Sequence, residues 1–300
     1  MSVSHKVSPV LRLLLPAFVV ILIVVAVPLL FSFYTSFTSY RLTRPDSILN
    51  VIGFKNYIRL FGSSEFWYAL LRTIAFLTVV LNLEMLFGLG IAMLVNQVTR
   101  GQRLIRTIVM FPMMFSPMLV GFQFKFMFND NIGIVNHILQ HWFGVTEAIP
   151  WLVDGRLAFF SLAVAEIWNS TSVFAILLLA GLMAMPQDPI EAAKVDGCTP
   201  WQAFRHVTLP FLMPFVYIAM TIRSLDVGRA FDIVKIMTDG GPAGRTELIW
   251  TLSARAGYED ARMGYANAMS YIAVLLSIAF TLYFFRKLTA ARQFLNEADA

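Results

Sequence analysis

Charged and polar side chains interrupt the long apolar runs of this 300-residue sequence. The segment RSLDVGRAFD carries four charged residues at successive steps of three: Arg223, Asp226, Arg229 and Asp232. Residues three apart on a helix are neighbours on one face and can form ion pairs. Ionisable residues inside apolar spans are energetically expensive and are candidates for function. We therefore expect Arg223 and Asp226 either to pair within the protein or to offer charged hydrogen-bonding groups to a hydroxyl-bearing ligand.

Two other apolar runs carry polar groups of the same kind. The segment EIWNS places Glu166, Asn169 and Ser170 within about one helical turn, so they form a polar face on an apolar helix. Glu84 stands in the middle of an earlier run, close to Asn82. A carboxylate at such a position is expected either to form a structural pair inside a helix bundle or to serve as a proton or ion site.

The histidine and cysteine residues give weaker indications of a functional site. His137 and His141 are four residues apart and fit one helical face, but no third metal ligand accompanies them, so surface histidines are the simpler interpretation. The single cysteine, Cys198, excludes an internal disulfide and a thiolate metal cluster. No arrangement of Ser, His and Asp, or of Cys and His, indicates a catalytic site.

The composition is that of an integral membrane protein. Hydrophobic residues make up 58% of the chain and charged residues only 14%, with a mean hydropathy of +0.70. Soluble domains usually contain about a quarter charged residues. The net charge of +5 is interpreted as basic cytoplasmic loops facing lipid headgroups, and no nucleic-acid partner is expected.

Six apolar runs are long enough to cross a bilayer, which takes roughly 20 helical residues. They cover residues 11–34, 68–96, 105–128, 158–184, 208–236 and 264–287. Because backbone groups in hydrocarbon must be satisfied within the element, and the runs lack strand alternation, all six are predicted to be helices. The first is too long for the core of a signal peptide and is expected to be a retained span.

The distribution of basic residues predicts the orientation of these spans. The short loop Gln97–Arg103 and the C-terminal end are rich in Arg and Lys, whereas the segment Asn129–Leu157 contains one Arg. Short basic loops remain on the cytoplasmic side. We therefore expect both termini in the cytoplasm.

A polar stretch, EAAKVDGCTPWQAF, separates two of the predicted spans. Asp188, Pro189 and Glu191 suit the cap, the first position and the capping-box carboxylate of a short helix. Gly197 is suited to the left-handed residue that ends such a helix. Thr199 then begins the same pattern again as a cap, with Pro200 next and Gln202 three residues after the cap. The available apolar contacts are Ile190, Val195, Trp201 and Phe204.

The stretch therefore predicts two short helices meeting at an angle. An ordinary connection between helices usually has 2 to 8 residues, so about 20 structured residues need a reason. A helix-turn-helix DNA reader is disfavoured because a helix held against a bilayer could hardly enter a groove. Docking of a cytoplasmic partner fits best.

Several segments carry a family resemblance. Glu191-Ala192-Ala193, Gly197 and Leu209-Pro210, within EAAKVDGCTPWQAFRHVTLPFLMP, resemble the EAA loop of membrane subunits of bacterial binding-protein-dependent ABC importers. The segments GFKNY, FDIVKIMTDGGP and GYANAMSYI extend the similarity to the sugar-type permeases, the group of maltose, trehalose and glycerol-phosphate importers. Cys198 and Val207 stand where alanine and isoleucine are usual.

The resemblance implies an all-α integral membrane protein of six transmembrane helices with the type I importer permease, or MetI-like, fold. It also implies a non-catalytic pore subunit in the bacterial cytoplasmic (inner) membrane, working with a second homologous permease, two ATPase subunits and an extracytoplasmic substrate-binding protein. Since the sequence contains no GxxxxGK[ST] loop, ATP and Mg are expected on the ATPase, and no cofactor on this chain. The implied ATPase-coupling residues are Glu191, Ala192, Ala193, Asp196, Gly197, Leu209 and Pro210.

By the same resemblance, the substrate pocket of a sugar or polyol lies near mid-membrane between the spans that carry Glu166, Asn169, Ser170, Arg223 and Asp226. The expected organisation is a cytoplasmic N-terminus with the first helix (1–34), an extracytoplasmic loop (35–67), a permease core (68–288) with coupling helices at 188–206, and a cytoplasmic tail (289–300). A stand-alone ion-coupled transporter or channel using Glu84 is the alternative, although it has no use for a paired docking helix.

Overall fold

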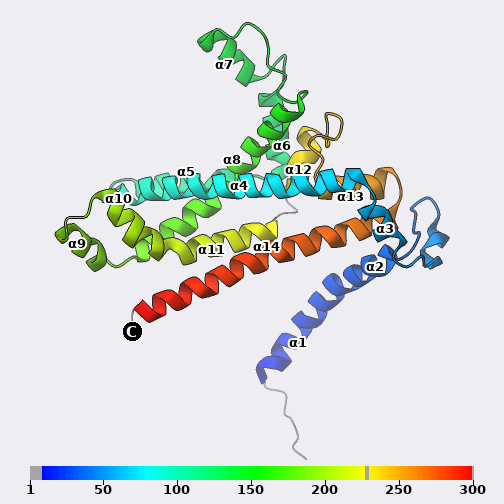
Figure 1. The fold of residues 1–300 in the computed structure, drawn as a ribbon, viewed down its shortest axis with the longest axis horizontal. Helices are drawn as coiled ribbons and strands as arrows, with labels where there is room; N and C mark the ends of the chain where they lie inside the picture. Colours follow the sequence, from blue (N-terminus) through cyan, green and yellow to red (C-terminus); the bar gives the residue numbers. More distant parts are fainter. Residues whose placement is uncertain (1–8, 227–229, 299–300) are drawn as a thin grey trace, which may run out of the picture. The chain divides into compact units, whose positions relative to one another are not determined.

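A computed structural model describes residues 9–226 and 230–298 of the chain (Figure 1). Arg229 and the outermost residues of both expected cytoplasmic ends lie outside these ranges. The described residues are mostly helical and contain two isolated β-bridges but no strand. They divide into two compact units, residues 1–66 with 253–272 and residues 67–252 with 273–300.

The first unit contains an apolar span and the short helices that pack at its end. Its helices are α1 (Pro9–Ile21), a π-turn (Leu22–Ala26), α2 (Val27–Ser36), a 3₁₀ turn (Pro45–Leu49), α3 (Lys55–Phe61), a second π-turn (Arg255–Glu259) and the start of α14 (Met263–Ala298). Apolar side chains from Leu14 to Tyr34 are largely exposed, as expected for a helix that faces lipid.

Two of the sequence motifs meet in this unit. In GFKNY, the buried Asn56 donates hydrogen bonds of 2.8 Å to the carbonyls of Ser36 and Thr38. In GYANAMSYI, Asn267 donates a 2.6 Å hydrogen bond to the Thr35 hydroxyl. A Cβ at Gly264 would collide with the carbonyl oxygen of Thr38, so this position admits only glycine. The motifs therefore attach α3 and the start of α14 to the end of α2.

The second unit contains most of the chain. Its helices are most of α4 (Ser64–Gln97), α5 (Gln102–Met110), a 3₁₀ turn (Pro112–Met114), α6 (Pro117–Met127), α7 (Ile134–Phe143), α8 (Gly155–Ala184), α9 (Asp188–Val195), α10 (Pro200–Ala203), a π-turn (Phe204–Thr208), α11 (Leu209–Leu225), α12 (Ala230–Met237), most of α13 (Ile249–Ala254) and the rest of α14. Asp154 caps α8 by accepting hydrogen bonds from the N–H groups of Arg156 and Leu157, which lowers the pKa of the Asp154 carboxyl.

Among the described residues, five helices are long and apolar enough to cross a membrane: Leu14–Ser36, Ser64–Gln97, Gly155–Ala184, Pro200–Ser224 and Met263–Ala291. The expected helix over 105–128 is the exception, because it is broken into α5, a 3₁₀ turn and α6. Pro112 and Pro117 cause the break, since proline lacks an N–H and collides with the preceding turn. Ser116 then caps α6 by accepting a hydrogen bond from the Leu119 N–H.

The expected helix over 208–236 also differs. The span begins earlier, at Pro200, and α11 ends at Leu225, while α12 is a separate helix that packs against α6 and α8. Whether the chain is helical between them falls on 227–229, outside the described residues. Lys125 of α6 donates a 2.9 Å hydrogen bond to the carbonyl of Ile236 and so ties α6 to α12.

Close helix crossings hold α4, α8 and α11 together. A Cβ at Gly88 of α4 would collide with Phe174 of α8, and a Cβ at Gly181 of α8 would lie 2.8 Å from the Phe215 ring of α11. Small residues at such crossings let helix backbones approach closely in membranes. These two glycines therefore bring the polar faces of the three helices within reach of one another.

Two hydrophobic clusters fill this unit. One joins α4, α6, α8 and α12, and the other joins α4, α8 and α11. Along α4, Val80 belongs to the first cluster and Ala92 to the second. Along α8 the corresponding residues are Ala165 and Phe174. Glu84 is flanked in sequence by Leu81 and Met85 of the second cluster, and Glu166 by Ala165 and Ile167 of the first, so the two carboxylates belong to different clusters.

Candidate functional site

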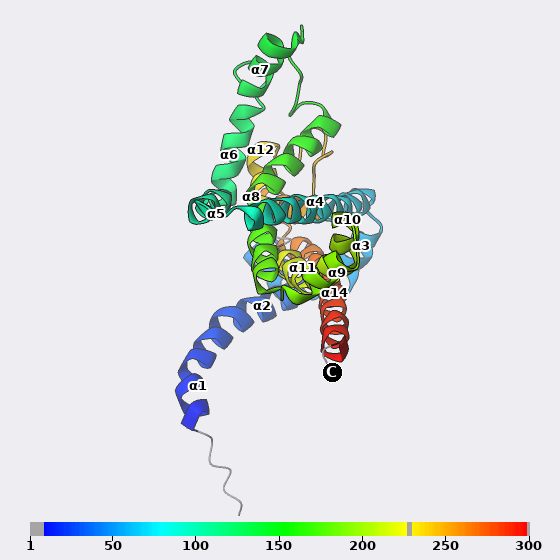
Figure 2. The same cartoon turned by 90° about the vertical axis from the view of Figure 1, so that its left-hand side faces the viewer.

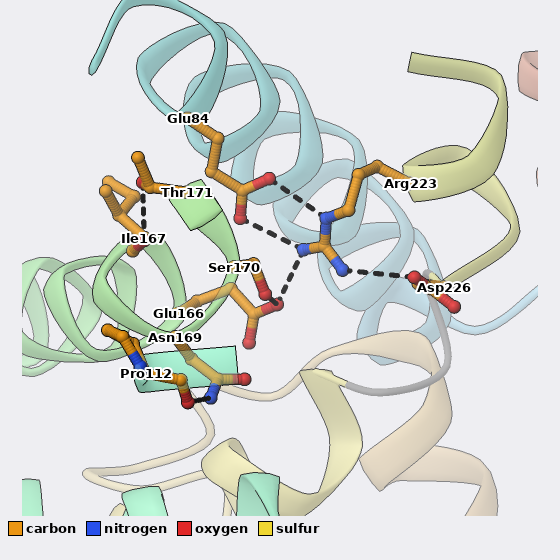
Figure 3. A network of polar contacts seen from close by, with 9 residues as sticks. All are labelled: Glu84, Pro112, Glu166, Ile167, Asn169, Ser170, Thr171, Arg223 and Asp226. Carbon is orange, nitrogen blue, oxygen red and sulfur yellow. Dashed lines mark hydrogen bonds and ion pairs between the residues drawn. The ribbon is translucent and has the colours of Figure 1, made fainter. Parts of the chain in front are cut away.

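The polar side chains of α4, α8 and α11 converge on Arg223 (Figure 3). Its Nε and Nη2 donate hydrogen bonds of 3.0 Å to Oε2 and Oε1 of Glu84. Nη2 also lies 2.9 Å from Oε1 of Glu166, and Nη1 lies 3.4 Å from Oδ2 of Asp226. We call these four residues, Glu84, Glu166, Arg223 and Asp226, the Arg223 cluster. One guanidinium thus holds three carboxylates from three segments of the chain.

The Arg223 cluster is largely withdrawn from solvent. The exposed fractions are 0% for Glu84, 4% for Glu166 and 6% for Arg223. A buried charge must be paired and hydrogen-bonded, and the fork of an arginine suits a carboxylate in a bidentate geometry. The desolvation of such groups offsets much of their attraction, so the cluster is poor evidence of net stability. Removing one partner from it is nevertheless strongly destabilising, because an unpaired buried charge remains.

Asp226 differs from the other members of the cluster. Its side chain is 21% exposed, compared with 0% for Glu84 and 5% for Glu166, and its contact with Arg223 is the longest of the three. It follows the last residue of α11, beyond regular helix. Of the three carboxylates, Asp226 is therefore the one placed to meet a molecule outside the protein interior.

The other two residues named on α8 are occupied by local structure. Asn169 donates a 2.9 Å hydrogen bond to the carbonyl of Pro112, at the break between α5 and α6 (Figure 3). Ser170 donates a 3.4 Å hydrogen bond to Glu166 Oε1. The polar face predicted for this helix is present, and it joins the Arg223 cluster to the proline break.

The structure separates the other candidates named from the sequence. Asn82 is exposed and donates to the carbonyl of Thr78, so it does not accompany Glu84. Asp232 lies in the first turn of α12, and Arg229 is not described. His137 and His141 stack with ring centroids 4.1 Å apart on exposed α7, and no group of three or more potential metal ligands occurs among the described residues.

A second region of interest is the polar stretch 188–206, which we call the two-helix island. It lies between α8 and α11 at one end of these helices (Figure 1). Gly197 adopts a φ of +77°, Cys198 N–H donates to the Ala193 carbonyl at 3.0 Å, and Gly197 N–H donates to the Lys194 carbonyl at 3.1 Å. These are the two hydrogen bonds of a Schellman motif, which closes α9 as expected.

The start of α10 also follows the prediction. The Thr199 hydroxyl accepts a hydrogen bond from the Gln202 N–H while the Gln202 side chain accepts one from the Thr199 N–H, which completes a capping box. The predicted capping box at Asp188 is wrong, because Asp188 is the first residue of α9 and no side chain caps that helix. Because assigned helix ends vary by a residue or two, the decisive observation is that no side chain accepts a hydrogen bond from the first turn of α9.

The outer surface of the island is apolar as well as charged. Val195 and Trp201 are 87% and 66% exposed, and the Trp201 ring stacks on Phe204 at 5.4 Å. Glu191 and Asp196 are exposed beside them, whereas Ala193 is buried. Such a surface combines apolar anchors with a charged rim, the composition of a protein interface.

Sequence reasoning missed some of the site. It did not connect Glu84 with Arg223, which is 139 residues away, and it did not single out Lys125 or Arg106. A signal was available for all of them, because each is an ionisable residue within or beside an apolar run. Which of these residues contact one another is determined only by the tertiary structure.

The fold and this site define a class: a multi-pass helical membrane protein with a buried charge cluster and an exposed polar island between two spans. The chain belongs to the family described as the binding-protein-dependent transport system inner membrane component, whose model matches residues 84–293. The match begins at Glu84 and includes the two-helix island. This chain is therefore a permease component of such a transport system.

Several permeases are similar to this chain over most of their length. The trehalose/maltose transport system permease protein MalF of Thermococcus litoralis is 33% identical over 274 residues, which is 91% of this chain and 91% of that protein. The sulfoquinovosyl glycerol transport system permease protein SmoG of Agrobacterium fabrum is 30% identical over 91% of this chain and 88% of its own. A probable ABC transporter permease of Sinorhizobium fredii is 34% identical over 91% and 88%.

Solved structures support the fold. A bacterial ABC transporter involved in the import of the acidic polysaccharide alginate matches with a TM-score of 0.77 and 23% identity over 95% of both chains. The MetNI methionine ABC transporter matches with a TM-score of 0.53 and 19% identity, covering 76% of this chain and 99% of that chain. The expected type I importer permease fold is confirmed.

Proposed function

We propose that this chain is one permease of an ATP-driven importer that carries a sugar or polyol across the cytoplasmic membrane. The observation that carries the proposal is the two-helix island, whose backbone is capped internally while Val195, Trp201 and Glu191 face outward. A transporter working alone has no use for such a surface. The names of the trehalose/maltose and sulfoquinovosyl glycerol relatives support a sugar as cargo.

The island is proposed to dock on an ATPase subunit. Its coupling residues are Glu191, Ala192, Ala193, Asp196, Gly197, Leu209 and Pro210. Ala193 lies against the island's own backbone and supplies the carbonyl of the Schellman motif, so it sets the shape of α9. Leu209 and Pro210 begin α11, directly after the π-turn that continues α10. A push on the island would therefore pass along α11 towards Arg223.

ATP hydrolysis is assigned to other subunits. The sequence contains no GxxxxGK[ST] phosphate loop, so two ATPase subunits are proposed to bind ATP and Mg, and this chain needs no cofactor. A second, homologous permease completes the pore, and an extracytoplasmic binding protein delivers the cargo. Both termini are proposed to lie in the cytoplasm. This orientation places the island on the cytoplasmic side of the membrane, where ATP is available.

The cargo is proposed to pass the Arg223 cluster. Glu166, Asn169, Ser170, Arg223 and Asp226 line this part of the path. Arg223 acts as a positioning residue, because its Nε, Nη1 and Nη2 are all engaged by carboxylates. Asp226 is the group proposed to accept hydrogen bonds from cargo hydroxyls.

Reconstitution tests the proposal. The chain would be purified with its partner permease and two ATPase subunits, placed in proteoliposomes, and supplied with the cognate binding protein and labelled disaccharide, monosaccharide or polyol. We expect uptake that requires both ATP and the binding protein, with a hydrolysis-deficient ATPase as the control. Uptake by this chain alone, driven by an ion gradient, would establish the ion-coupled alternative instead.

A further inference from the structure

An apolar hollow lies between α4, α5 and α8, away from the Arg223 cluster. Its volume is about 150 Å³. Aliphatic and methionine side chains form nearly all of its wall, together with one arginine: Ile91, Ala92, Val95, Arg106, Val109, Met110, Ala175, Ile176, Leu179, Ala180 and Met183. Apolar cavities of ~150 Å³ in proteins stay dry and take up apolar molecules. The hollow is therefore suited to a hydrocarbon segment rather than to water.

Arg106 is poorly satisfied in this wall. Its Nε is buried without a hydrogen-bond partner, and its Nη2 lies 3.0 Å from the sulfur of Met183, which is a weak acceptor. No carboxylate of the described residues forms an ion pair with it. Arg223, in the same unit, has three carboxylate partners. A guanidinium that is partly withdrawn from water and has no carboxylate beside it is able to take up an anion from outside the chain.

The surroundings identify the kind of anion. Met183 stands near the end of α8 that leads to the two-helix island, and Arg100 and Arg103 are exposed on the connection and helix next to Arg106. The proposed orientation puts this end at the cytoplasmic headgroup layer, where anionic lipids attract basic residues. A small hydrated anion would gain nothing from the aliphatic wall. A ligand with an anionic head and a hydrocarbon chain matches both parts of the site.

We propose that the groove between α4, α5 and α8 binds an anionic phospholipid. The phosphate lies against the guanidinium of Arg106, which holds two oxygens at once, and the first part of one acyl chain fills the hollow. The hollow, of about 150 Å³, admits the first few carbons of an acyl chain but is too small for a helix of a partner subunit. Only the assignment to the cytoplasmic leaflet rests on the proposed function, since the binding itself depends on Arg106 and the apolar wall.

Native mass spectrometry of the complete transporter tests this proposal. The delipidated complex in detergent would be titrated with phosphatidylglycerol, with phosphatidylcholine of the same chains, and with inorganic phosphate. We expect phosphatidylglycerol to bind at least about tenfold more tightly than phosphatidylcholine, because the choline cation beside the same phosphate is repelled by Arg106. Inorganic phosphate, which has no acyl chain, should not compete. Arg106→Leu should abolish that preference. Arg103→Leu, on the same helix but outside the hollow, should retain it.

A second variant separates the charge from the hollow. Ala180 lines the hollow and is exposed, so Ala180→Phe should fill it without disturbing packing elsewhere. We expect weaker phosphatidylglycerol binding although Arg106 is intact, and this variant carries the test if Arg106→Leu does not assemble. Equal binding of the two lipids by the wild type, unchanged preference in both variants, or displacement by phosphate would overturn the proposal. Sugar uptake by the same preparation tests the proposed function separately.

Discussion

The Arg223 cluster and the two-helix island both place charge in an apolar chain, but they satisfy it differently. In the cluster, Glu84, Glu166 and Arg223 are buried and satisfy one another across three helices. In the island, local caps satisfy the backbone, while the side chains of Glu191 and Trp201 face outward. The first region is complete within the chain, and the second is suited to a partner.

This difference predicts how each region responds to damage. A residue removed from the cluster leaves a buried charge without its partner, so stability should fall first. A residue changed on the island leaves the contacts within the helix bundle in place, so coupling should fail while the protein remains folded. Four experiments test this contrast, from the largest expected effect to the smallest.

The largest effect is expected from Arg223→Leu. This change leaves Glu84 and Glu166 buried without a cation, and breaking such a pair typically costs about 3–5 kcal/mol of stability. The measurement is the thermal denaturation of the purified complex together with its yield. Arg103→Leu, an exposed arginine of α5, serves as the control and should change stability little. Equal melting temperatures for the two variants would show that the cluster is not structural.

The second effect is expected from Gly197→Val. The φ of +77° costs a residue with a Cβ roughly 1–2 kcal/mol, and no heavy atom lies within 4 Å of the added carbon. The strain should therefore redirect α9 without disturbing the spans, so that membrane levels are normal and transport is lost. Gly144→Val has a similar φ of +68° in open space outside the island and is the matched control. Normal uptake by the Gly197 variant would refute the coupling role.

A smaller effect on stability, but a specific one on transport, is expected from Asp226→Asn. Arg223 keeps Glu84 and Glu166, so stability should change by less than about 1 kcal/mol. If Asp226 meets cargo hydroxyls, the set of sugars that compete for uptake should change. Asp46→Asn, in the first unit, removes an exposed carboxylate as a control. An unchanged competition profile would confine Asp226 to the internal ion pair.

The smallest perturbation uses Cys198, which is exposed at the junction of α9 and α10. A membrane-impermeant maleimide should leave it unlabelled in intact spheroplasts and label it in inverted vesicles stripped of the ATPase. Adding the ATPase back should slow the labelling. Labelling from outside would reverse the proposed orientation. Labelling that ignores the ATPase would remove Cys198 from the docking surface while leaving the orientation in place.

Local features of the fold could be predicted from the sequence. The left-handed Gly197 and the capping box of Thr199 and Gln202 depend on residues within a few positions, so their chemistry is visible in the chain itself. Four of the predicted spans correspond to long helices with nearby boundaries, because length and apolar composition are enough to define a membrane helix. The prediction of one helix over 105–128 was wrong, because it gave the apolar composition more weight than the helix-breaking effect of Pro112 and Pro117.

The pairings of charged side chains were decided by the tertiary structure alone. Pairing of Arg223 with Asp226, three residues away, was one of two alternatives open from the sequence. The two do make contact, but the shorter hydrogen bonds of Arg223 go to Glu84 and Glu166 on other helices. The crossings at Gly88 and Gly181 determine which polar faces meet. In the same way, Arg106 is an ordinary basic residue in the sequence and becomes a candidate lipid ligand only beside the hollow. Sequence determines which residues must find partners, whereas helix packing determines which partners they find, because those contacts join positions far apart in the chain.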